Sequence, residues 1–187
     1  LPETGLVVLT GVSGSGKTAL LHLLALRETP SRGEILIGGE NTARWSEARR
    51  SAWLRECAAA DEARLFADLT LSENAERAAV LAGFSGRDAR EALALLGLEG
   101  AAGVYPDRLS GEQRRLGALA CALARKGRVL LLDEPADGLS AESAETVLSL
   151  LGEAAADQLV IVAARNAEPF GEDARVLTLE DGQIASD

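Results

Sequence analysis

The stretch GVSGSGKT (residues 11–18) follows the apolar run LVVLT (6–10) and precedes the leucine-rich run KTALLHLLAL (17–26). The first run is typical of a buried strand, and the second predicts a helix. Glycines in such a loop allow backbone conformations that turn successive N–H groups inward, and the helix that follows adds the positive end of its dipole. The full spacing G-x-x-x-x-G-K-T therefore predicts a loop that binds the phosphates of a nucleotide.

Each polar group of this loop has an expected role. Lys17 supplies a cation to the β- and γ-phosphates and takes part in catalysis, and the Thr18 hydroxyl is a candidate Mg²⁺ ligand. A chance Gly/Ser turn is the alternative, but the flanking strand and helix argue against it. The residues expected to contact the nucleotide are Gly11, Ser13, Gly14, Ser15, Gly16, Lys17 and Thr18.

A second motif, RVLLLDEPADGLS (128–140), ends an apolar strand with two carboxylates. A side chain at this position lies at the carboxyl edge of a parallel sheet, where ligands of open α/β sheets bind. We expect Asp133 to hold Mg²⁺ and Glu134 to orient or deprotonate an attacking water, as a catalytic base.

Composition limits the function classes. Apolar residues make up 47% of the 187-residue chain and charged residues 26%, which is typical of one ordinary globular domain. The net charge is −10 with no Lys/Arg-rich block, so we expect no nucleic-acid partner. No apolar run is long enough to cross a bilayer. Cys57 and Cys121 are far apart in the sequence and are expected to be buried apolar residues rather than zinc ligands or a disulfide.

The remaining pattern alternates strands with helices and predicts an α/β fold with a mainly parallel sheet and a helical insert. Capping boxes pair Thr70 with Glu73 and Ser110 with Gln113, and Gly97 is placed to end a helix. Further strands are expected at 34–38, 128–133, 159–164 and 174–180, and helices at 86–97 and 138–154. We expect one domain, with residues 1–66 and 126–187 as its core and 67–125 as a helical subdomain.

The segment YPDRLSGEQ (105–113) narrows the possible protein families. LSGEQ resembles the LSGGQ signature of the nucleotide-binding domain of ATP-binding cassette (ABC) transporters, with Glu112 in place of the second glycine. LFADLTLSEN (65–74) resembles the segment after that family's Q-loop, and VLTLEDGQI (176–184) resembles its terminal hairpin. The resemblance covers nearly the whole chain in the family's order, and it implies a P-loop ATPase fold that binds ATP and Mg²⁺.

The resemblance also implies partners. ABC ATPases form a head-to-tail dimer around two ATP molecules, so Ser110, Gly111 and Gln113 would contact the ATP held by a second protomer. The start of a helix at Ser110 suits this role, because its free N–H groups attract anions. The family further implies a transmembrane transporter subunit or domain, and a cytoplasmic location on the inner face of the cell membrane through that partner.

The sequence departs from the family at several functional positions. Asp61 stands at the Q-loop glutamine, where it can approach Mg²⁺ but cannot donate an amide hydrogen bond. Ala164 stands at the switch histidine, and no histidine follows His22. Ser140 stands at the last aspartate of the D-loop. Only ten residues precede Gly11, so the adenine-stacking aromatic has no counterpart. We therefore expect weak affinity for adenine and slow hydrolysis at this chain's own site.

Three functions remain open at this point. The first is the ATPase of an ABC transporter, the second a weakly active regulatory or assembly protein that senses ATP, and the third a soluble ABC ATPase without a membrane partner. The direction of transport is also open. YPDRLSGEQ resembles importers and lipoprotein-release systems, whereas EQRRLG, DGLS and VAAR resemble exporters.

Overall fold

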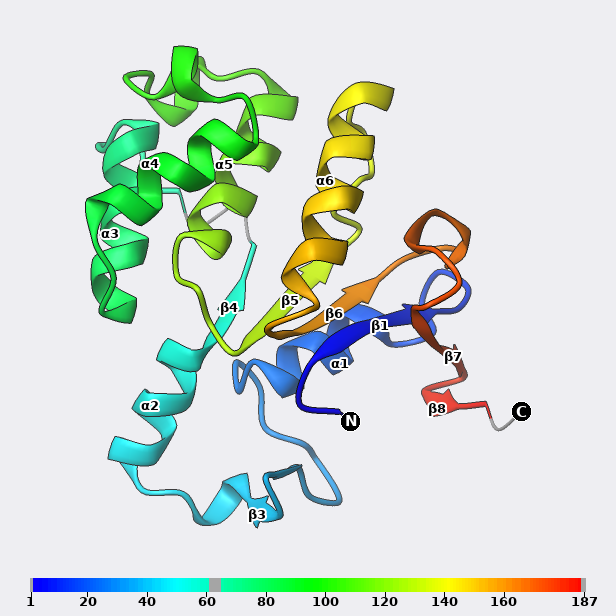
Figure 1. Cartoon of the computed structure of the whole chain (residues 1–187). Coiled ribbons are helices and arrows are strands. Elements are labelled where there is room, and N and C mark those ends of the chain that lie inside the picture. Colours follow the sequence, from blue (N-terminus) through cyan, green and yellow to red (C-terminus); the bar gives the residue numbers. More distant parts are fainter. Residues whose placement is uncertain (1, 61–64, 186–187) are drawn as a thin grey trace.

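The computed structural model describes residues 2–60 and 65–185, which form a six-stranded sheet with helices on both faces (Figure 1). The strand order is β4-β5-β6-β1-β7-β8, and every pair is parallel except β7–β8. The strands are β1 (Gly5–Thr10), β4 (Cys57–Ala59), β5 (Val129–Asp133), β6 (Leu159–Ala163), β7 (Arg175–Glu180) and β8 (Gln183–Ile184). This arrangement confirms the predicted α/β fold with a mainly parallel sheet.

In the described part of the chain, six α-helices accompany the sheet, and the alternation of strand side chains explains how helices cover both faces. They are α1 (Lys17–Leu24), α2 (Glu47–Glu56), α3 (Leu71–Ala82), α4 (Gly86–Leu95), α5 (Gly111–Leu123) and α6 (Ala141–Ala154). Val7, Leu131 and Ile161 belong to a cluster that includes Leu21 of α1. Their sequence neighbours point to the opposite face, in a cluster that includes side chains of α5 and α6. Because strand residues alternate between faces, each strand contributes to both layers of the core.

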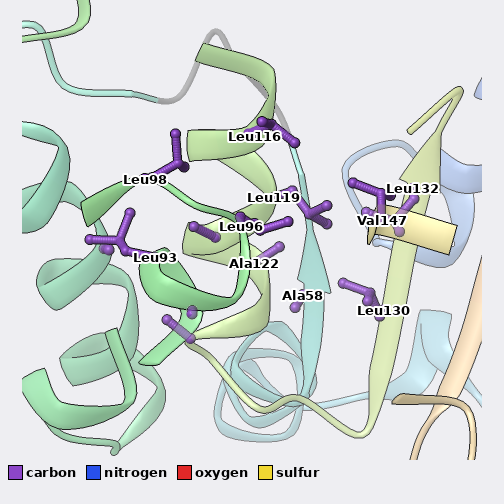
Figure 2. Close-up of a cluster of buried hydrophobic side chains, with 14 of the residues drawn as sticks. Ala58, Leu93, Leu96, Leu98, Leu116, Leu119, Ala122, Leu130, Leu132 and Val147 are labelled. Carbon is purple, nitrogen blue, oxygen red and sulfur yellow. The ribbon is translucent and has the colours of Figure 1, made fainter. Parts of the chain in front are cut away.

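The segment between β4 and β5 packs on the sheet through α5. Figure 2 shows Leu116, Leu119 and Ala122 of α5 facing Ala58 and the strand β5, within one cluster of buried side chains. Leu93, Leu96 and Leu98 extend this cluster toward α4. The three helices α3, α4 and α5 therefore share a continuous apolar core with the sheet.

Most expected strands and helices form close to their predicted bounds, and the local signals explain their ends. Both predicted capping boxes are present, at Thr70 before α3 and at Ser110 before α5. Gly97 lies just beyond the C-cap of α4 with a φ of 66°, a left-handed conformation that glycine adopts without a Cβ clash.

Three parts of the fold differ from the sequence prediction. The expected strand at 34–38 shortens to β2 (Leu36–Ile37), which pairs with β3 (Glu40–Asn41) in a separate two-stranded sheet. The strand β4 and the helix α2 were not predicted. Trp53 anchors α2, because its ring nitrogen Nε1 donates a hydrogen bond to the backbone oxygen of Leu24 at 3.0 Å. Within the described residues, the helices are too short or too polar to span a bilayer.

Candidate functional site

The phosphate loop connects β1 to α1 with the backbone geometry that its glycines allow. Gly11 has a φ of 142° and Gly16, the N-cap of α1, has a φ of 105°. At Gly11 a Cβ would run into the backbone oxygen of Leu179, so only glycine fits where the loop passes β7. The hairpin beyond β7 also holds the loop, because the Gly182 N–H donates to the Ser15 backbone oxygen at 3.1 Å.

Lys17 is the cation of this loop, and its amine is held in place. Its Nζ donates hydrogen bonds to the backbone oxygens of Gly11 at 2.7 Å and Val12 at 3.2 Å. The residue is 9% exposed. The Ser15 hydroxyl is buried nearby with no hydrogen-bond partner among the described residues. Among the described residues no carboxylate pairs with the Lys17 amine, so its donors are available to an incoming anion.

Thr18 and Asp133 meet at the carboxyl edge of the sheet, although β6 separates the strands β1 and β5 that lead to them. The Thr18 hydroxyl donates to Asp133 Oδ2 at 2.6 Å, although 115 positions separate the two residues in the sequence. Thr18 lies in the first turn of α1 and Asp133 at the last position of β5. A hydroxyl and a carboxylate are the hard oxygen donors that Mg²⁺ prefers, so this pair fits the predicted ion. The described residues hold no cluster of three or more His, Cys, Asp or Glu side chains placed to bind a metal.

Glu134 follows β5 in an unusual backbone conformation. Its φ is 47°, a left-handed value that costs a non-glycine residue roughly 1–3 kcal/mol. The backbone N–H of Glu134 donates to the Ala163 oxygen at 2.9 Å, which continues the β5–β6 ladder by one residue. Its carboxylate lies at the cavity beside the phosphate loop. This geometry holds a carboxylate at the wall of the cavity, close to the phosphate loop.

A cavity of about 1100 Å³ brings these groups together, and one charged residue among those that line it was not predicted. Arg165 lines the cavity along with the phosphate loop, Asp133 and Glu134. Its guanidinium Nη2 is 3.2 Å from Asp137 Oδ2, and its Nε is 3.9 Å from Glu134 Oε1. Arg165 is the second residue after the end of β6, at the same sheet edge as Asp133, and this position was the only signal in the sequence.

The signature corner, which we define as residues 110–115 with 137–140, does not line this cavity and reaches it only through the contact of Asp137 with Arg165. Ser110, Gly111 and Gln113 do not line it. Ser110 caps α5 instead: its hydroxyl accepts from the Gln113 N–H at 3.1 Å, and Gln113 Oε1 accepts from the Ser110 N–H at 3.0 Å. The two sets of predicted site residues therefore form two separate places on one protomer.

Glu112 has a contact that explains why it replaces glycine. Its Oε1 accepts hydrogen bonds from the Ser140 N–H at 2.9 Å and from the Ser140 hydroxyl at 2.8 Å. These bonds, the backbone one first, lower the pKa of the Glu112 carboxyl. Arg115 adds a second link, because it donates to the backbone oxygen of Asp137 at 2.5 Å. The start of α5 is thus tied to the D-loop positions.

The two remaining departures lie in different surroundings. Ala164 comes directly after β6, is 6% exposed and packs in the apolar core, so it offers no polar group to the cavity. Asp61 lies outside the described residues. Of the two cysteines, Cys57 is buried, and burial raises the pKa of its thiol to about 11.

The ABC transporter family model matches residues 1–137, which include the phosphate loop, LSGEQ and Asp133–Glu134. The chain belongs to the ABC transporter family. This ABC cassette is 35% identical, over 97% of its length, to the pyoverdine export ATP-binding/permease protein PvdT of Pseudomonas fluorescens. It is 33% identical to the macrolide export ATP-binding/permease protein MacB of Photorhabdus laumondii. It spans 29% of the length of each of these two proteins.

A further relative is matched over most of its own length. The cassette is 30% identical to an uncharacterized ABC transporter ATP-binding protein, MJ1508, of Methanocaldococcus jannaschii, over 98% of this chain and 85% of that protein. Among solved structures, the ATP-binding cassette MJ0796, a dimer bound to ADP and Pi, superposes with a TM-score of 0.89 at 27% identity. That match covers 100% of this chain and 85% of the other. This ABC cassette is therefore an ATP-binding ATPase domain.

Proposed function

We propose that this cassette is the ATP-hydrolysing part of an ABC exporter, in which closure of two cassettes around ATP drives a membrane component. The observation that carries the proposal is the 2.6 Å contact between Thr18 and Asp133 beside the amine of Lys17. It joins the phosphate loop to the acidic strand end at one cavity. Export is favoured over import because the relatives named for a transported substrate are export proteins.

Each group of the site has a role in this proposal. The amides from Ser13 to Lys17 bind the phosphates, and Lys17 neutralises their charge. Thr18 and Asp133 would hold Mg²⁺, which offsets phosphate charge when bound. Glu134 orients the water and accepts its proton. Hydrolysis is slow, because Ala164 brings no hydrogen-bonding group to the cavity.

A second cassette completes the site. Ser110, Gly111 and Gln113 of one protomer would contact ATP on the other, since they start a helix whose N–H groups attract anions. The two MJ0796 structures, each described as dimeric, support this arrangement. We infer the division of labour from it: residues 1–66 with 126–187 hold ATP, and the helical subdomain 67–125 presents the signature.

The membrane component would dock beside the helical subdomain and hold the cassette at the inner face of the membrane. A cavity of about 400 Å³ lies where α3 and α5 meet β4. Phe66 and Leu81 line it, are well exposed, and give it an apolar wall. Arg77 lies over the Phe66 ring at 4.5 Å and orients it. The fusion of ATP-binding and permease parts in the names of PvdT and MacB supports such a partner.

Two substitutions test the ATPase proposal. Lys17→Ala should lower ATP affinity about 10- to 100-fold, because it removes a charge-assisted contact to the phosphates. Glu134→Gln should leave ATP affinity within about threefold but lower single-turnover hydrolysis by about 100-fold, because it removes the base. Titration calorimetry and a single-turnover assay with excess protein measure the two effects.

Lys126 offers a matched control, because it is the only other lysine in the chain and lies away from the cavity. Lys126→Ala should bind and hydrolyse ATP like the unchanged protein. Equal affinities for Lys17→Ala and Lys126→Ala would refute the proposal.

A further inference from the structure

We propose that Arg165 binds the γ-phosphate of ATP on this chain's own loop, and that without nucleotide the same guanidinium rests against Glu134 and Asp137. The inference builds on the proposed function, because it concerns the same cavity. It assigns a triphosphate contact to a residue that the resemblance to the family does not mark.

The order of the strands places Arg165 between the two halves of the site. β6 lies between β5 and β1, and Ala163 pairs with Asp133 on one side and with Leu9 on the other. The residues that follow these three positions leave the sheet at the same edge. Arg165 therefore emerges between Glu134 and the phosphate loop, where the distal end of a bound triphosphate lies closest to the water-activating carboxylate.

Charge supports the assignment. Among the described residues that line the cavity, Lys17 and Arg165 are the cations, and Asp133 and Glu134 are the carboxylates. Lys17 is buried and bonded to its own loop, so it meets the β- and γ-phosphates from the side of the loop. A guanidinium offers several donors in a plane that matches phosphate oxygens. Arg165 is thus suited to the exposed side of the γ-phosphate, which Lys17 does not cover.

The present partners of Arg165 are easy to exchange. Its side chain is 75% exposed, and the contact with Glu134 is long, at 3.9 Å. Exposed ion pairs of this kind contribute little stability, so the dianionic end of a triphosphate competes well for the same guanidinium. When Arg165 turns to the phosphate, Glu134 loses a cationic neighbour and is free to accept a hydrogen bond from water. ATP, but not ADP, would make this exchange.

The test compares triphosphate and diphosphate binding in the full chain. Affinities for a non-hydrolysable ATP analogue and for ADP are measured for the unchanged protein, Arg165→Gln and Arg165→Lys. Arg165→Gln should weaken the triphosphate about tenfold and ADP less than about twofold, because a charge-assisted contact to the γ-phosphate is lost. Arg165→Lys keeps the charge without the planar guanidinium, so its affinity for the triphosphate should lie between those of the unchanged protein and Arg165→Gln.

Arg87→Gln is the matched control, because Arg87 is also exposed but lies on α4, away from the cavity. It should leave both affinities unchanged. Three results would overturn the inference: equal losses for the two nucleotides, no loss for either, or tighter triphosphate binding by Arg165→Gln. The last result would show that the arginine only restrains Glu134 and Asp137.

The outcome is separable from that of the proposed function. If Lys17→Ala impairs ATP binding and Arg165→Gln does not, the loop binds ATP and only the role of Arg165 is refuted. If Lys17→Ala has no effect, ATP does not occupy this loop, and both proposals fail.

Discussion

The phosphate loop and the signature corner belong to the same ATPase design, yet they follow the family pattern to different degrees. The loop at 11–18 keeps the full spacing, and its Thr18 meets Asp133. The signature corner carries Glu112 for glycine and Ser140 for aspartate, and these two substituted residues hydrogen-bond to each other. The comparison teaches that two departures from a motif can form a contact with each other, instead of leaving a contact unmade.

The difference has a physical basis. The loop must fit a ligand with its backbone, and Gly11 has no room for a Cβ beside Leu179. Within its own protomer, the signature corner holds a helix start and a turn in place. A carboxylate that accepts two hydrogen bonds from Ser140 does this as well as a backbone contact would. Glu112 and Ser140 therefore form a contact of their own at this corner.

The largest effect is expected in the phosphate loop. Gly11→Ala should lower the free energy of unfolding by roughly 2–4 kcal/mol and abolish ATP binding, because the added methyl group meets the Leu179 backbone at a φ of 142°. Urea denaturation and nucleotide titration measure both losses. Gly103→Ala is the control, since a Cβ there meets nothing within 4 Å. If Gly11→Ala loses no more stability and ATP affinity than Gly103→Ala, the phosphate loop tolerates a Cβ and is not more constrained than the signature corner.

An intermediate effect is expected at the signature corner. Ser140→Ala should cost about 1 kcal/mol of stability from the lost cap of α6, beyond its contact with Glu112. Glu112→Gln should also destabilise, and the double variant should lose less than the sum of the two. Urea unfolding of the four proteins gives the coupling. Additive losses of stability would show that the Glu112 and Ser140 side chains do not stabilise the fold through their mutual contact.

Acid should remove this coupling, and the sign follows from the lowered pKa of Glu112. A carboxyl whose pKa is lower in the folded chain stabilises it at a pH above its unfolded pKa of about 4.3. That stabilisation is lost as the pH falls through the lower, folded pKa. The coupling measured at pH 7 should therefore shrink at pH 3. As a control, a double-mutant cycle of unfolding free energies between Glu112 and the distant Ser149 should show no coupling at either pH.

Local signals in the sequence were enough for much of the fold. Thr70 with Glu73 and Ser110 with Gln113 predicted two helix starts, since both partners lie within one turn. The apolar runs predicted β1, β5, β6 and β7. β4 was missed because Cys57–Ala59 is three residues long and has no β-branched side chain. α2 was missed because its sequence EARRSAWLRE has almost no apolar face beyond Trp53.

The site was predictable only as far as its motifs reach. Lys17, Thr18, Asp133 and Glu134 were found because loop spacing and a strand end identify them. Arg165 was missed because it reaches the cavity only through the position of β6 between β5 and β1. The bond between Glu112 and Ser140 joins residues 28 positions apart, and no local pattern predicts it.

The smallest effect is expected for Asp88, which lies in neither region. Its carboxylate caps α4 through Ser85 and is 2.7 Å from Lys126 Nζ, just beyond α5. Lys126 and Ser85 together hold the pKa of Asp88 well below its usual range. Asp88→Asn should lower the urea midpoint at pH 7. The difference from the unchanged protein should begin to shrink as the pH falls below the unfolded pKa of about 4, and it should be lost only as the pH falls through the much lower folded pKa.

Glu91→Gln provides the control, because Glu91 approaches the same lysine at a longer distance of 3.6 Å and should change the midpoint less. ATP affinity shows whether the contact between Asp88 and Lys126 affects the phosphate loop or the signature corner. Since Asp88 stabilises the helices without contacting the phosphate loop or the signature corner, Asp88→Asn should leave ATP affinity within about twofold. A larger change would mean that packing among the helices sets the shape of the loop, and that the two regions are coupled through the core they share.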